Sequence, residues 1–125
     1  MNGLSLDAGG LIALDRDDRR VNLLLKRAVE RGERITVSAT VLAQVIRNPA
    51  RQARLNRFIR QAETNIISLS GDEASAVGVL LAQTATTDIA DAHVVLCAQR
   101  AGHPILTSDV GDLLRIDPEI QLIKV

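Results

Sequence analysis

The sequence predicts a single α/β domain, an α/β/α sandwich around a central and mainly parallel sheet. Short apolar runs typical of strands alternate along the chain with longer segments that have helical hydrophobic spacing. Parallel strands need crossover connections of such length, so this alternation indicates a parallel sheet with helices on both faces. The length of 125 residues suits one hydrophobic core, and we expect one domain over residues 1–125.

The chain begins with a predicted strand at 4–7, a short apolar run that ends in aspartate. A short helix is expected at 8–16. Apolar residues recur every three or four positions over 19–32, and Gly32 is a typical C-cap, so a second helix is expected there. The alternating, β-branched segment 34–38 predicts the second strand.

The middle of the chain repeats this order of elements. Helical segments are expected at 39–47 and 50–63, and Asn48-Pro49 separates them because proline cannot continue a helix. The apolar run 65–69 predicts a third strand.

The last part of the chain adds the remaining elements. Helices are predicted at 72–84 and 88–102 from their apolar spacing. A fourth strand at 104–108, a short helix at 110–116 and a fifth strand at 120–125 complete the order.

Composition limits the classes of protein that this sequence can encode. Hydrophobic residues make up 46% of the chain, and Phe58 is its single aromatic residue, so the core must be aliphatic. No apolar run reaches the ~20 residues that a membrane span needs. The first residues have no basic region of a signal peptide, and Cys97 has no partner for an intrachain disulfide. We therefore expect a cytoplasmic protein with no membrane contact.

The net charge of zero conceals an uneven distribution along the chain. Residues 1–62 have 12 Lys/Arg and 6 Asp/Glu, whereas residues 63–125 have 3 Lys/Arg and 9 Asp/Glu. The basic half could bind a polyanion, or the two halves could form surfaces that attract each other.

Five aspartates fall where elements of the predicted sheet end or begin. Functional groups in open α/β sheets gather at the carboxyl ends of the strands. Asp7 ends the first strand, and Asp109 follows the fourth, with Asp112 one helical turn later. Asp88 and Asp91 open the helix before that fourth strand. The order of elements therefore predicts that these acids lie around one edge.

Each of these acids also has a simpler explanation as a helix cap. Aspartate is a good N-cap, and Asp88 with Asp91, like Asp109 with Asp112, has the spacing of a capping box. Capping does not explain why Asp91 points the same way as apolar residues of its helix. A carboxylate that faces the core is costly unless it is paired or binds a cation, and Arg100 is the nearest basic residue in the sequence.

A divalent cation would remove the repulsion between clustered carboxylates. Ligation by oxygen alone suits Mg²⁺ or Mn²⁺, and such ions activate water for attack at phosphorus. The acids therefore predict a metal-dependent phosphoester hydrolase.

Four segments in order resemble the PIN domain, and most closely its VapC type, the toxin halves of bacterial and archaeal toxin–antitoxin pairs. These segments are LSLDAGGLIAL, VSATVLAQVIR, TTDIADAHVVLCAQ and ILTSDVGDLL. The resemblance covers essentially the whole chain, and the ordered set is more specific than any one segment.

The resemblance implies a PIN-like α/β/α sandwich and a Mg²⁺- or Mn²⁺-dependent ribonuclease. It assigns Asp7, Asp91 and Asp109 as catalytic residues and metal ligands, with Asp112 as a further ligand. Asp88 is expected to cap its helix or to support the ligands. The resemblance also implies an RNA substrate, a cognate antitoxin protein and a homodimer.

One position departs from the family pattern. The family usually has glutamate in its third helix, where this chain has Gln44. Glutamine has no negative charge, so metal binding is weaker here, or another acid such as Asp88 replaces the missing glutamate. The alternative function is a catalytically weak PIN domain that binds RNA or an antitoxin without cutting.

A basic ridge is predicted in the first half of the chain, because arginines recur there every three or four residues with no acid between them. Such a surface could contact RNA phosphates, bind an acidic antitoxin tail or simply face solvent. We expect the antitoxin groove among the helices of 19–63. The ridge comprises Arg47, Arg51, Arg54, Arg57 and Arg60.

Three other patterns do not predict a functional site. His93 and Cys97 have the i, i+4 spacing of metal ligands, but no second His/Cys pair exists, so Cys97 is expected to be a core residue. The AGG at 8–10 lacks both common phosphate-loop patterns. A receiver domain is excluded because Asp72 and Lys124 lie too far from the required positions.

Overall fold

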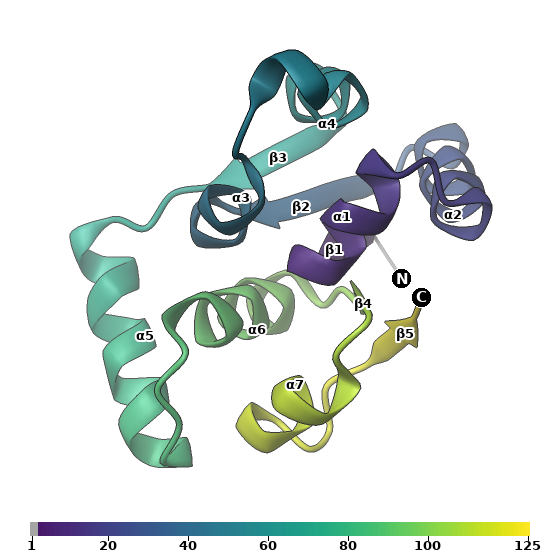
Figure 1. Cartoon of the computed structure of the whole chain (residues 1–125). Helices are drawn as coiled ribbons and strands as arrows, with labels where there is room; N and C mark the ends of the chain where they lie inside the picture. The colour runs from purple at the N-terminus through teal and green to yellow at the C-terminus, as the bar shows by residue number, and fades with distance from the viewer. Residues whose placement is uncertain (1–2) are drawn as a thin grey trace.

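A five-stranded sheet forms the centre of the computed structural model, which describes residues 3–125; Met1 and Asn2 of the expected domain lie outside this range. Its strands run in the order β3-β2-β1-β4-β5, and every neighbouring pair is parallel (Figure 1). The strands are β1 (Gly3–Leu6), β2 (Arg34–Ser38), β3 (Thr64–Ile67), β4 (Ile105–Thr107) and β5 (Leu122–Lys124).

Helices cover both faces of the sheet, which confirms the predicted α/β sandwich and its order of elements. Helices α1, α2 and α4 lie on one side, and α6 lies on the other with α5 and α7 beside it (Figure 1). The helices are α1 (Ala8–Asp15), α2 (Arg19–Glu30), α3 (Ala39–Val45), α4 (Ala53–Arg60), α5 (Gly71–Thr84), α6 (Ile89–Ala101) and α7 (Val110–Ile116).

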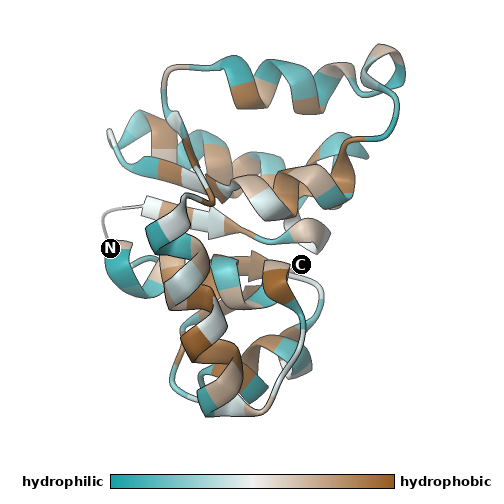
Figure 2. Ribbon diagram, turned by 90° about the vertical axis from the view of Figure 1, so that its left-hand side faces the viewer, coloured by the Kyte–Doolittle hydropathy of each residue, from teal (hydrophilic) through white to brown (hydrophobic). Residues whose placement is uncertain are grey.

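The core is aliphatic apart from the buried Phe58, as the composition requires. Leu6, Val37 and Leu106, from the three central strands, are completely buried. Hydrophobic and hydrophilic segments alternate along the helices that enclose these strands (Figure 2). Within residues 3–125, no helix is long and apolar enough to cross a bilayer.

The helix predicted at 50–63 is interrupted in the structure. A 3₁₀ turn occupies Pro49–Arg51, and α4 begins only at Ala53. The side chain of Gln52 explains the break: its Oε1 accepts from the backbone N–H of Arg47 at 3.0 Å, and its Nε2 donates to Val45 O at 2.9 Å. These bonds fold the connection back onto α3, so the arginines at 47–60 do not lie on one helix.

The side of the sheet to which the chain adds new strands changes at β1, while all strands stay parallel. From β1 the chain adds β2 and then β3 on one side, whereas β4 and β5 lie on the other. In open parallel sheets, ligands bind outside the carboxyl ends of the strands at such a switch point. The ends of β1 and β4 are therefore the expected position of a functional site.

Ala85, in the loop between α5 and α6, has a backbone conformation whose cost a substitution can measure. It has a left-handed conformation with φ of 54°, which suits glycine better than alanine. We expect Ala85→Gly to raise the free energy of unfolding by about 0.5–1 kcal/mol in urea denaturation. Gly102 has φ of 71° and open space around its Cα, so Gly102→Ala should have the opposite effect. A loss of stability in Ala85→Gly would contradict this explanation.

Candidate functional site

Asp7 lies at the carboxyl end of β1 and is 4% exposed. It is the N-cap of α1, and its Oδ1 accepts from Gly10 N at 2.9 Å. Its Oδ2 accepts a hydrogen bond from the Thr107 hydroxyl at 2.5 Å. Because a carboxylate offers about four acceptor positions, these two bonds hold the group in place and leave acceptor capacity for a cation.

Two glycines after Asp7 allow α1 to approach the end of β4. A Cβ added at Gly9 would lie 2.0 Å from Ser108 Oγ, and one at Gly10 would lie 2.7 Å from Leu106 O. Neither backbone could pack as it does with a larger residue. The glycines of the AGG segment thus bring Asp7 and Thr107 into contact.

Asp109 extends the cluster from the other side of the switch point. Its backbone N–H donates to Thr107 Oγ1 at 2.8 Å, so one hydroxyl connects Asp7 with Asp109. Asp109 is also the N-cap of α7, where Asp112 lies in the first turn. The pKa of Asp112 is raised, first by its hydrogen bond with Asp109 and then by the charge of that residue.

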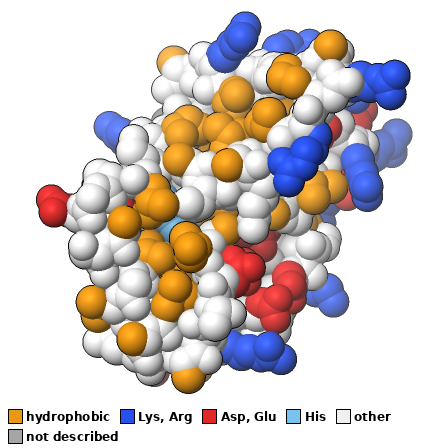
Figure 3. Space-filling model, turned by 60° about the vertical axis from the view of Figure 1, so that its left-hand side comes forward, with side chains coloured by type: hydrophobic (Ala, Val, Ile, Leu, Met, Phe, Trp, Pro, Cys, Tyr) orange, Lys and Arg blue, Asp and Glu red, His pale blue; other side chains and the backbone are white. Residues whose placement is uncertain are grey.

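Asp88 and Asp91 approach from the start of α6. Asp88 is the predicted N-cap, and its Oδ1 accepts from the backbone N–H of Asp91 at 2.8 Å. The Asp91 side chain is half-buried and lines a hollow of about 310 Å³ together with Asp88 and Asp112. Figure 3 shows a group of acidic side chains on this face of the molecule.

The electrostatics show that the carboxylates influence one another. The pKa of Asp91 is raised to about 6 by burial, and then by the charges of Asp88, Asp112, Asp7 and Asp109, in that order. The pKa of Asp7 is also raised, mainly by burial and with Asp109 contributing. The donor set is thus a group of oxygens with repelling charges, which fits a hard divalent cation such as Mg²⁺ or Mn²⁺.

The carboxylates do not form a closed ligand cage in this structure. Among residues 3–125, three ligand atoms that all lie within 4.8 Å of one another are found at Glu73, His93 and Cys97, not among the aspartates. The aspartates interact electrostatically but are not drawn together as tightly as this group, and a Mg²⁺ ion that keeps several waters needs only one or two direct carboxylate ligands.

Gln44 lies beside this site on α3, exposed to solvent. It lines a shallow hollow together with Thr40, Thr87 and Asp88. The carboxylate of Asp88 is therefore the acidic group that shares a hollow with the glutamine.

Two residues of the site were missed by the sequence analysis. Thr107 orients Asp7, and Arg115 lines the acidic hollow with its Nη1 3.6 Å from Asp112 Oδ1. The i, i+3 spacing of Asp112 and Arg115 on one helix was a signal that could have identified the arginine. The threonine had no signal beyond its place two residues before Asp109.

The arginines of the basic ridge are exposed but differ in their contacts. Arg47 donates to the carbonyl oxygens of Ala43 and Ile46 at the end of α3. Arg54 forms an ion pair with Asp17 at 3.5 Å, whereas Arg51 lies in the 3₁₀ turn. The residues predicted to contact RNA are thus distributed over the bend after α3, the 3₁₀ turn and α4 rather than over one helix face.

Solved structures that share this fold include VapBC2 from Rickettsia felis bound to a DNA fragment from its promoter, with a TM-score of 0.70, 18% identity and 98% coverage of both chains. FitAB bound to the IR36 DNA fragment matches at 0.65 and 13% identity, covering 97% of this chain and 94% of that chain. FitAcB from Neisseria gonorrhoeae matches at 0.61 and 16% identity, covering 96% of both. No protein-family model and no curated protein matches the sequence significantly. The chain therefore has the PIN-like fold of these VapBC2 and Fit structures.

Proposed function

We propose that this protein is a metal-dependent ribonuclease of the VapC toxin type, a single PIN domain over residues 1–125 that hydrolyses RNA phosphodiesters in the cytoplasm. The observation that supports it most directly is the gathering of five aspartates around the ends of β1 and β4, where burial and then the charges of the other four raise the pKa of Asp91. The likeness to VapBC2 and FitAB over nearly the whole chain adds to this proposal.

The proposed roles combine the resemblance to the PIN family with the position of each side chain. Asp7, Asp91 and Asp109 are the catalytic acids and metal ligands, and Asp112 is a further ligand. Asp88 and Gln44 support them from the adjoining hollow. A bound Mg²⁺ or Mn²⁺ supplies Lewis-acid activation of water for attack at phosphorus. The chain itself holds Asp7 through Thr107 and leaves the hollow open to an RNA strand.

The partners belong to the same proposal. Arg47, Arg51 and Arg54 are exposed and could contact RNA phosphates. VapBC2 and FitAB were solved bound to DNA fragments. By the same resemblance we propose a cognate antitoxin protein for this chain and assembly as a homodimer. Leu23 is an exposed apolar residue in the 19–63 region expected to bind the antitoxin, and Val79 and Ile89 are exposed apolar residues outside it.

RNA cleavage by the purified protein tests the proposal, with Mg²⁺, with Mn²⁺ and with a chelator. We expect cleavage that needs the metal and falls by ~100-fold or more in Asp7→Asn, because asparagine caps α1 equally well but has no charge. Asp15→Asn, which changes an acid of α1 outside the cluster, is the matched control and should cleave like the parent protein.

The alternative is a binding module that does not cut RNA, and the uncharged Gln44 is the observation that favours it. Absence of cleavage in both metals, by a folded protein that still binds RNA, would support this alternative. Cleavage that is equal in Asp7→Asn and the parent would contradict the assigned catalytic site.

A further inference from the structure

A second group of metal-ligating side chains lies where α5 meets α6. Glu73 is in the first turn of α5, and His93 and Cys97 are one helical turn apart on α6. One ligand atom from each lies within 4.8 Å of the other two. His93 is fully buried and Cys97 is 5% exposed, so the group is largely shielded from solvent.

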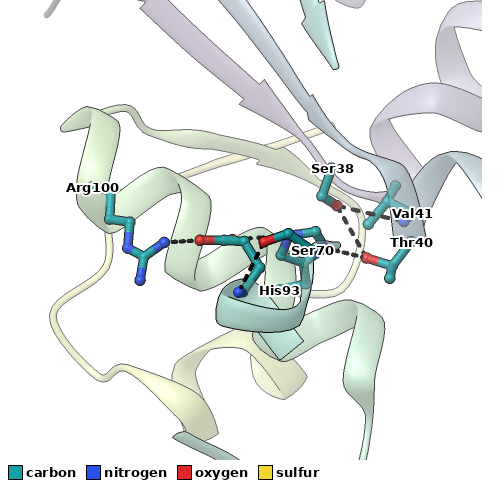
Figure 4. A network of polar contacts seen from close by, with 7 residues as sticks. Ser38, Thr40, Val41, Ser70, His93 and Arg100 are labelled. Carbon is teal, nitrogen blue, oxygen red and sulfur yellow. Dashed lines mark hydrogen bonds and ion pairs between the residues drawn. The ribbon is translucent and has the colours of Figure 1, made fainter. Parts of the chain in front are cut away.

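Residues outside this group bind the other polar atoms of His93 and Glu73, so that one atom of each faces the other ligands. The Nδ1 of His93 is 2.7 Å from the Thr40 hydroxyl, so the Nε2 faces Glu73 Oε2 at 3.2 Å. The other carboxylate oxygen of Glu73 pairs with Arg100. Figure 4 shows Thr40, His93 and Arg100 in this network of contacts. Metal-binding histidines and carboxylates in proteins are typically held by outer partners in this way.

The donor types differ from those of the acidic edge. Nitrogen, sulfur and one carboxylate oxygen suit Zn²⁺, whereas the aspartates offer oxygen alone. Ligands ~2.0–2.3 Å from a tetrahedral ion lie roughly 3.3–3.8 Å apart. The His93 Nε2 to Glu73 Oε2 distance of 3.2 Å is already close to this range, and the other two separations need to shorten by about 1–1.5 Å at most, which small side-chain rotations can provide.

A cavity of about 460 Å³ adjoins the group and gives an ion access to it. Glu73 and Cys97 line this cavity together with Arg34, Arg100 and His103. A tetrahedral ion with three protein ligands keeps one position for water or another small ligand. The two arginines favour an anionic occupant of that position.

We propose that Glu73, His93 and Cys97 bind a Zn²⁺ ion whose fourth position opens into the adjoining cavity. The site is separate from the aspartates, although both use α6. It connects the start of α5 to α6, and through Thr40 to α3. The proposal is independent of the ribonuclease activity.

Titration of the purified full chain with Co²⁺ tests this site spectroscopically. Tetrahedral Co²⁺ absorbs in the visible, and a thiolate ligand adds a charge-transfer band in the near ultraviolet. Because Cys97 is the single cysteine, that band can come from no other residue. We expect both signals to saturate at one ion per chain and to disappear when Zn²⁺ is added.

Two ligand variants and one control variant make the assignment specific. Cys97→Ala should lose the charge-transfer band while its circular dichroism stays that of the parent, and Glu73→Gln should weaken Co²⁺ binding. Asp91→Asn should keep the band, because its carboxylate belongs to the acidic edge. Zn²⁺ at ~100 times its Kd should raise the Tm of the parent by about 10 °C, and that of Cys97→Ala by much less.

The proposal is overturned if the folded parent shows no thiolate-to-cobalt band at an excess of Co²⁺. It is equally overturned if Cys97→Ala retains the same spectrum and the same Zn²⁺-dependent rise in Tm. In either case the three residues only connect α3, α5 and α6 by hydrogen bonds and packing. Excess Mg²⁺ should leave the band unchanged, which separates this result from metal binding at the aspartates.

Discussion

Asp91→Asn is expected to abolish Mg²⁺-dependent RNA cleavage while the protein stays folded. Asparagine matches aspartate in size, and the backbone N–H of residue 91 can still donate to Asp88. The change removes one negative charge from the proposed metal ligands. We expect cleavage to fall by more than the roughly 10–100-fold that loss of an outer partner of a metal ligand costs.

The same variant should stabilise the metal-free protein in a pH-dependent way. Folding raises the pKa of Asp91 to about 6 from the ordinary value of 3.8. Between these values the folded state holds a proton that the unfolded state has lost, so stability falls as pH rises through this interval. Asp91→Asn removes that loss of stability. The variant should therefore be no more stable than the parent below pH ~4, and its full gain in stability should be reached above pH ~6.

Thermal melting without metal, at several pH values, measures this gain. Because Asp91 is only half-buried, solvent screening limits it to about 1–2 kcal/mol, or a Tm rise of about 3–6 °C near neutral pH. Added Mg²⁺ should raise the Tm of the parent and have little effect on the variant.

Asp88→Asn is the matched comparison, because asparagine caps a helix as well as aspartate does. We expect nearly unchanged stability and a modest loss of cleavage. If Asp88→Asn loses cleavage instead, Asp88 compensates for the glutamate that is absent at Gln44, whose hollow it shares. If Asp91→Asn cleaves like the parent, Asp91 is only part of a helix cap.

Thr107→Val is expected to disrupt both stability and cleavage, although it alters the shape of the side chain very little. The Thr107 hydroxyl donates to Asp7 Oδ2 and accepts from Asp109 N, and the residue is completely buried. Valine leaves both groups without this partner. The free energy of unfolding should fall by about 1–3 kcal/mol, measured by urea denaturation.

The loss of this hydroxyl should also change the pH profile of cleavage. Its hydrogen bond lowers the pKa of Asp7, which burial raises. In Thr107→Val the pKa of Asp7 should therefore rise further, and cleavage should require higher pH. Thr107→Ser keeps the hydroxyl and should retain the parent profile with a smaller loss of stability. Equal stability and equal cleavage in the parent and Thr107→Val would contradict this role.

Local patterns in the sequence were sufficient for the order of strands and helices. The β-branched segment at 34–38 and the apolar spacing over 19–32 correspond to β2 and α2. Asp88 was correctly predicted as an N-cap because capping depends on a few neighbouring residues. The break at Gln52 was missed, because its side chain bonds to backbone groups of the preceding segment in a way that helical spacing does not encode.

What the sequence determined by itself was the class of fold, since it follows from the alternation of strands and helices along the chain, and the acids expected near the strand ends remain a prediction from that same order. The tertiary structure decided which other residues join them. Thr107 lies 100 positions from Asp7, and Glu73 lies 20 positions from His93. Contacts across such separations depend on how helices pack against the sheet. The spacing of apolar residues within one segment does not predict that packing.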